Sequence, residues 1–333
     1  MKRVITTIVI FLSLFASSTN ATTLKIATLA PDGTYWMKSM RQAAKTIQQE
    51  TEGRVKLKFF PGGVQGSDQS VLRKMRIGQL QGGAVANGVF AKLAPASQLY
   101  SLPFTFNNLE ELHAIRPDFD QHIIDGLADK GYIVLGMSEA GFAYMMSNKE
   151  IRSSDDMRKR KVWSPEGDIV SKVTFENGDV DPIMLPIADV YTSLQTGLID
   201  TIAVNPTSAI ALQWHTKLNY ATDYPLVFLM GMLVIDQRAF KKVSETDQVI
   251  VRKIIGDTFD AMSVQNAKDE ASARNALVNN GMSFLELSDD DKRQWKGLAE
   301  EALKELAEEG VYPVDVYTDM TARISELRNS ANE

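Results

Sequence analysis

The stretch LPIADVYTSLQTGLIDTIAVNP, residues 185–206, carries the clearest structural pattern in the chain. Pro186 is a favourable first residue of a helix, apolar residues then recur at spacings of three and four, and Gly197 is a typical helix terminator. The run 198–204 is mostly apolar, as a strand covered on both faces is. Because ligands of open α/β sheets gather beyond the carboxyl ends of strands, Asn205 is predicted to lie at a binding site.

The chain begins with a pattern typical of a secretory signal. Lys2 and Arg3 precede an apolar run over residues 4–15, and small residues follow up to Ala21. We predict a signal peptide over residues 1–21, cleaved near Ala21, and a mature protein in the periplasm. The alternative is an uncleaved membrane anchor, although the apolar run is shorter than the roughly 20 residues that span a membrane.

The composition excludes several functional classes. The chain has 333 residues, 44% of them hydrophobic and 23% charged, which is ordinary for a folded protein large enough for two domains. Without Lys2 and Arg3, 34 basic side chains oppose 42 acidic ones, a formal charge of −8, and no basic cluster suits a nucleic acid partner. The absence of cysteine excludes disulfides, thiolate metal sites and cysteine nucleophiles.

The order of predicted elements is that of an α/β protein, with helices between strands. The main strands are expected at 24–29, 55–60, 82–87, 132–137, 142–147, 182–185, 198–204 and 226–235. The small residues at the start of 82–87 indicate either close approach by a backbone or ligand, or tight packing of a helix on the sheet. A helix without proline is predicted over about 244–280, and its length allows it to bridge two domains.

The motifs of common enzymes are missing. The sequence contains no G-x-S-x-G, H-E-x-x-H, phosphate-binding loop or dinucleotide-binding glycine pattern. The histidines His113, His122 and His215 are scattered, and Asp155 and Asp156 are adjacent, so they cannot act as paired acids. We therefore predict no enzyme activity, no cofactor and no metal, and favour a protein that binds a ligand by domain closure.

Four segments resemble the solute-binding subunits of tripartite ATP-independent periplasmic (TRAP) transporters, the DctP type of family 7. They are LKIAT at 24–28, FFPGGVQGSDQSVLRKMRIGQL at 59–80, KVWSP at 161–165 and DVYTSLQTGLIDTIAVNP at 189–206. The resemblance implies a two-domain α/β fold of the class II-like, Venus flytrap type with a long helix bridging both domains. It also implies a cleft that closes on a small-molecule solute, and delivery to a TRAP-type membrane permease with a small and a large subunit.

The same resemblance suggests where the domains divide. Residues 22–147 and 236–333 are expected to form domain I, which includes the bridging helix and the C-terminal helices. Residues 148–235 are expected to form domain II, which contains the opening stretch at 185–206.

The ligand site departs from the pattern of the family it resembles. Typical members hold a substrate carboxylate with an arginine in a K-I-R-V-P segment, and Trp163 occupies that place here. Tryptophan has one N–H donor and a broad apolar face, so it cannot replace a bidentate guanidinium. Whether Arg158 or Arg160 replaces the missing arginine is left open by the sequence.

Other positions where family members often place polar ligand contacts are also apolar here. This predicts an apolar or aromatic solute or a weakly polar organic acid, with Asn87 and Asn205 orienting any polar end. Ordinary core packing is the alternative for each aromatic residue. The candidate ligand-binding residues are Leu29, Trp36, Asp68, Asn87, Phe90, Tyr144, Trp163, Ile187, Asn205 and Trp214.

A second function stays open at this point. A periplasmic carrier or sensor subunit with an apolar pocket hands a lipid-like ligand to a protein partner instead of a permease. A periplasmic helical-repeat protein is then the candidate partner.

Overall fold

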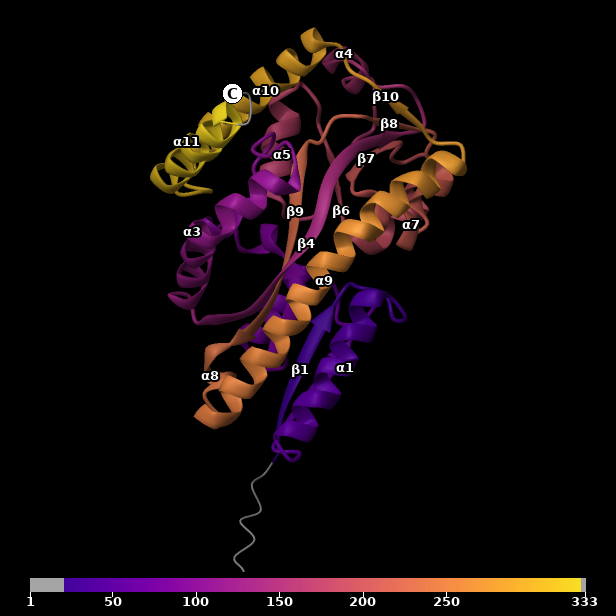
Figure 1. Ribbon diagram of the computed structural model, residues 1–333. Coiled ribbons are helices and arrows are strands. Elements are labelled where there is room, and N and C mark those ends of the chain that lie inside the picture. Colours follow the sequence, from indigo (N-terminus) through magenta and orange to yellow (C-terminus); the bar gives the residue numbers. More distant parts are fainter. Residues whose placement is uncertain (1–20, 331–333) are drawn as a thin grey trace, which may run out of the picture.

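Two long strands and one long helix run through the whole molecule in the computed structural model, which describes residues 21–330 (Figure 1). Strand β4 (Tyr132–Ser147) pairs antiparallel with β9 (Val227–Asp236). Helix α9 (Glu245–Asn279) has 35 residues and passes beside both lobes in Figure 1. The expected signal peptide over residues 1–21 lies outside the described residues except for its last residue, Ala21.

The first lobe contains three parallel strands of the large sheet. Strand β1 lies between β2 and β3, and β3 pairs antiparallel with β9. Glycines at the start of β3 permit tight packing, because a Cβ on Gly83 would lie 2.7 Å from Val71 of the covering helix. The elements of this lobe are β1 (Thr22–Thr28), α1 (Tyr35–Glu50), β2 (Val55–Phe60), α2 (Asp68–Arg76), β3 (Gly82–Ala86), the 3₁₀ turns η1 (Asn87–Phe90) and η2 (Pro95–Gln98), α3 (Leu109–Ala128) and α8 (Gln237–Phe240).

The apolar stripe of α1 explains how this lobe is joined to α9. Helix α1 is capped by Thr34, whose side chain accepts a hydrogen bond from the Met37 amide. Its buried face packs with β1 against the buried stripe of α9, which includes Val251 and Phe259. The start of α9 is held by Arg54, which donates to both carboxylate oxygens of Asp247 at 3.0 Å.

The second lobe is assembled on the far end of β4. Strand β7 pairs with β4 there, β8 pairs with β4, and β10 pairs with β8, while β5 and β6 form a small separate sheet. The elements are α4 (Ser154–Met157), β5 (Trp163–Pro165), α5 (Ile169–Asn177), β6 (Ile183–Leu185), η3 (Ile187–Asp189), α6 (Val190–Thr196), β7 (Thr201–Val204), α7 (Pro206–Ala211), η4 (Trp214–Lys217), β8 (Tyr220–Thr222) and β10 (Ser283–Leu285).

The last two helices pack on different parts of the molecule. Helix α10 (Asp289–Glu308) lies against α5 and α4, and α11 (Val314–Ser330) lies against α3. The contacts of α10 therefore differ from the expectation that all of residues 236–333 belong to the first domain. The domain limits themselves stay a prediction.

Two sequence predictions about strands need correction. The expected strands 132–137 and 142–147 are one strand, β4, because the Glu139–Gly141 segment forms a register shift in the pairing with β9 instead of a turn. The strand expected at 198–204 begins only at Thr201, since Leu198 is 49% exposed and follows the left-handed helix end at Gly197.

Candidate functional site

A cavity of about 480 Å³ lies between segments of the two lobes. The loops that follow β1 and β3 contribute from the first lobe, and β5, α5 and the end of β7 contribute from the second. The carboxyl ends of the parallel strands β1 and β3 meet at this edge of the sheet, which is where α/β proteins bind ligands.

Most of the candidate ligand-binding residues line this cavity. They come from both lobes and from segments far apart in the sequence. They are Leu29, Trp36, Asp68, Asn87, Trp163, Ile187, Asn205 and Trp214. Their contact with a solute stays a prediction.

Phe90 and Tyr144 do not line the cavity, so their expected role is corrected. Phe90 is fully buried in the first lobe, with its ring 5.6 Å from that of Tyr132. The ring centroid of Tyr144 lies 6.3 Å from that of Phe284, while the neighbouring residue Met145 lines the cavity. Successive side chains of a strand point to opposite faces, so Tyr144 and Met145 cannot share one.

Trp163 presents an apolar surface to the cavity. Its only donor, Nε1, already donates to the backbone oxygen of Leu185 at 3.0 Å, and the residue is 4% exposed. Its ring packs edge-on against Trp214 at a centroid distance of 5.4 Å. Every tryptophan of the sequence, Trp36, Trp163, Trp214 and Trp295, lines this one cavity.

The two arginines nearest to Trp163 in the sequence, Arg158 and Arg160, are bonded to other groups outside the cavity. Arg158 donates to the backbone oxygen of Gly178 and pairs with Asp155 at 2.6 Å. Arg160 lies 3.9 Å from Asp200. Neither residue lines the cavity, and none of the described lining residues is a lysine, arginine or histidine.

The charged groups of the cavity are acidic. Asp68, the first residue of α2, accepts from the Ala86 amide through Oδ2 at 2.9 Å, while its Oδ1 is buried and has no partner among residues 21–330. Burial raises the pKa of Asp68 to about 6. Burial also raises the pKa of Asp168, which caps α5 through Ser171, and Glu166 is the third acidic lining residue.

Asn87 and Asn205, which we predicted to orient the solute, use their side-chain N–H groups in hydrogen bonds within the protein. Asn87 Nδ2 donates to the backbone oxygen of Ser97 at 3.0 Å. Asn205 Nδ2 donates to the backbone oxygen of Ala140, and only its Oδ1 is buried without a partner in the described chain. Asn205 can therefore offer an acceptor, but not a donor, to a solute.

Sequence reasoning missed the contribution of α10. Trp295, Leu298 and Ala299 line the cavity from this helix. The period of buried residues along α10 marks an apolar face, which was visible in the sequence. That face alone could not show that α10 packs on the second lobe beside the cavity.

The two lobes touch along one side of the cavity. A Cβ on Gly167 would lie 2.9 Å from Gln69 Nε2, and a Cβ on Gly88 would lie 3.7 Å from Asp168 Cγ. Gly167 also has a φ of +83°, a conformation that other residues rarely adopt. The two lobes therefore meet at this side of the cavity.

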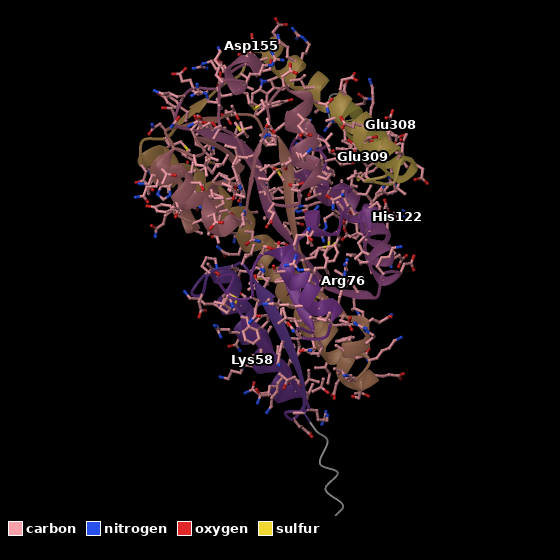
Figure 2. All side chains as sticks on the ribbon, turned by 180° about the vertical axis from the view of Figure 1, so that it is seen from behind. Lys58, Arg76, His122, Asp155, Glu308 and Glu309 are labelled. Carbon is pink, nitrogen blue, oxygen red and sulfur yellow. The ribbon has the colours of Figure 1, made fainter. Side chains whose placement is uncertain are left out.

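Other kinds of site find little support. Across residues 21–330, no group of three or more histidine, aspartate or glutamate side chains is placed to hold a metal ion. No helix within the same range is long and apolar enough to cross a membrane. The charged side chains labelled in Figure 2, such as Lys58, Asp155 and Glu308, lie on the outside of the molecule.

This architecture, with a cavity between two lobes, is that of a ligand-binding protein that closes on a solute. Residues 26–309 match the model of the family described as bacterial extracellular solute-binding protein, family 7, and the chain belongs to that family. It is 25% identical over 283 residues to the sialic acid-binding periplasmic protein of Vibrio cholerae, covering 84% of this chain and 87% of the relative. It is 21% identical over 283 residues to the C4-dicarboxylate-binding periplasmic protein of Rhodobacter capsulatus, covering 84% of each.

Solved structures confirm the predicted fold. A TRAP periplasmic solute-binding protein from Pseudomonas putida, with bound D-glucuronate, superposes with a TM-score of 0.82 at 21% identity. The match covers 91% of this chain and 96% of that one. The family consists of solute-binding receptors and not enzymes, and these relatives are periplasmic by name.

We predict that Asp68→Asn stabilises the solute-free protein near neutral pH. The pKa of Asp68 is raised above its ordinary value, so its contribution to stability is present below about pH 4 and lost as the pH rises through about 6. The variant should be more stable by on the order of 2 kcal/mol at pH 7.5 and about equal at pH 4, as measured by urea unfolding. Asp32→Asn, which removes a 63% exposed carboxylate, is the control, and a pH-independent difference for Asp68→Asn contradicts the prediction.

Proposed function

We propose that this chain is the periplasmic solute receptor of a TRAP-type transporter and that its solute is uncharged and largely apolar or aromatic. The proposal of an uncharged, largely apolar or aromatic solute rests on the composition of the cavity lining. Four tryptophans line it, its charged groups are acidic, and its described lining residues contribute no cation. A carboxylate solute would be surrounded by like charges with no guanidinium to pair with.

The relatives differ from this chain in the solutes that their names give. Sialic acid, C4-dicarboxylates and D-glucuronate are acids, and a buried carboxylate is favoured by a nearby cation. The shared fold supports capture by closure and delivery to a permease with small and large subunits. The chemistry of this cavity favours a different class of solute.

The apolar surface is sufficient for useful affinity without an ion pair. Burying roughly 300 Å² of solute at about 25 cal/mol per Å² contributes on the order of 7 kcal/mol before the costs of association. Hydrogen bonds to the buried acceptors Asp68 Oδ1 and Asn205 Oδ1 add orientation.

Closure requires bending where the lobes are joined. Strand β4 has register shifts at Val134/Gly136 and at Glu139/Gly141, and such irregularities allow a strand to bend. The alternative of a carrier or sensor with a helical-repeat partner is not favoured by any contact in this structure.

Native mass spectrometry of protein purified without refolding tests the proposal. We expect a co-purifying uncharged organic molecule, and after its removal a change in tryptophan fluorescence when it is added back, because all four tryptophans line the cavity. A bound sugar acid or dicarboxylate contradicts the apolar-solute proposal while leaving the receptor role intact. A chain that neither retains nor rebinds any small molecule contradicts both.

A further inference from the structure

The cavity extends along the whole of helix α5. The lining residues of this helix and its C-cap, Val170, Ser171, Thr174, Phe175 and Gly178, follow one another at spacings of one, three, one and three. Residues at such spacings share one face of a helix. The nine residues of α5 at about 1.5 Å each give a wall about 13 Å long.

Asp68 lies at the amino-terminal end of this wall. Gln69, the next residue of α2, contacts Gly167 just before α5 begins. Ala86, which donates its amide to Asp68, is two residues from Gly88, and Gly88 lies against Asp168. The buried Oδ1 of Asp68 can accept a hydrogen bond and receives none from the described chain.

Trp295 lies at the opposite end of the wall. It packs in the same apolar cluster as Phe175, and Leu298, one helical turn further along α10, lies 3.8 Å from where a Cβ of Gly178 would be. Trp295 is 3% exposed and lines the cavity, and its Nε1–H has no acceptor within residues 21–330. A buried donor without a partner is costly, which indicates that a ligand supplies the acceptor.

We infer that the solute is an elongated, two-ended molecule: a hydroxyl group at Asp68, an apolar chain along α5, and a carbonyl group at Trp295 Nε1 beneath α10. This inference rests on the proposed function and assigns it a class of solute, a hydroxylated acyl chain. The part of the cavity beneath α10 is a subsite for the carbonyl end. An extended carbon chain advances about 1.25 Å per carbon, from C–C bonds of about 1.5 Å, so about ten carbons span the wall.

A series of ω-hydroxy fatty acid methyl esters tests the inference on the full mature protein, with tryptophan fluorescence or calorimetry as the readout. Affinity should be greatest for chains of about ten to twelve carbons and fall for shorter and longer ones. Replacing the ester by a methyl group, or removing the hydroxyl, should each weaken binding by about 5- to 10-fold, the value of one hydrogen bond.

The variant Trp295→Phe keeps an aromatic ring and removes the N–H. We expect it to abolish the preference for the ester over the methyl-terminated chain while preserving the preference for the hydroxyl. Trp214→Phe is the matched control, and it should weaken ester and methyl-terminated chains by the same factor.

Two results overturn the inference. One is binding of these chains without dependence on length, and the other is an ester preference that survives in Trp295→Phe. A failure of every chain to bind, together with a compact solute found by native mass spectrometry, overturns the two-ended solute but leaves the receptor function in place.

Discussion

Trp163→Arg should convert the cavity from one that prefers an apolar solute to one that admits small carboxylates. Trp163 is 4% exposed and packs on Trp214, so losing its ring removes a large buried apolar contact. Loss of a buried aromatic side chain costs about 3 kcal/mol or more of folding stability. The natural solute also loses its apolar contact with this ring, so its affinity should fall by about 10-fold or more. A guanidinium in its place supplies the bidentate donor that the cavity lacks.

The same change should make the solute-free protein depend on carboxylate for its stability. An unpaired buried charge costs about 3 to 5 kcal/mol, and a ligand at 100 times its Kd returns about 2.7 kcal/mol by mass action. Thermal unfolding with and without D-glucuronate measures this, and only the arginine variant should respond.

Trp163→Phe is the control for this substitution, since it removes the Nε1 bond to Leu185 but keeps an apolar ring. It should retain most of the affinity for the natural solute and show no response to D-glucuronate. Unchanged binding of the natural solute by Trp163→Arg removes Trp163 from the site and contradicts the prediction.

Periodicity and end signals predicted the parts of the fold that are decided locally. The helix expected over about 244–280 is α9, which buries Val251, Ile255, Phe259 and Met262 and is capped by Ser244 through the Asp247 amide. Gly197 ends α6 in the left-handed conformation. Irregular strand pairing was not visible in the same way, because Glu139–Gly141 has the composition of a turn but continues β4.

The sequence predicted which residues line the cavity where they directly follow the end of a strand. It did not predict them where strand register or helix packing decides which way the side chain points. Asn205 and Leu29 line the cavity for the first reason. Tyr144 faces away because strand register decides which face it occupies, and the sequence does not state that register. Trp295 was missed because α10 reaches the cavity only through its packing on α5, a contact between residues more than 100 positions apart.

Arg116→Met should destabilise the protein by about 3 kcal/mol, because it leaves the carboxylate of Glu139 buried and without its main partner. Glu139 is 4% exposed and its side chain contacts Arg116 and His113. The loss should lower the melting temperature by about 6 to 10 °C. Arg41→Met, which breaks an ion pair with both partners at least half exposed, is the matched control and should cost less than about 1 kcal/mol.

Adding Glu139→Gln to Arg116→Met identifies the cause of the loss. If the unpaired carboxylate is responsible, the double variant should be more stable than Arg116→Met alone, despite carrying one more change. A double variant that is less stable by the sum of both changes contradicts this, and assigns the loss to the Arg116 contact with Asp120 instead.

The position of Glu139 also links this pair to solute binding. It lies at a register shift of β4, its neighbours Ser138 and Ala140 line the cavity, and its backbone oxygen accepts from Asn266 of α9 at 2.9 Å. Removing the ion pair at this register shift should raise the population of conformations in which the two lobes are apart. The apparent Kd for the solute then increases by the reciprocal of the fraction of closed protein. Calorimetric titration of Arg116→Met with the co-purified solute should show weaker binding, although Arg116 lies outside the cavity lining. Equal affinity in the variant and the unmodified protein shows that the ion pair stabilises the fold without influencing closure.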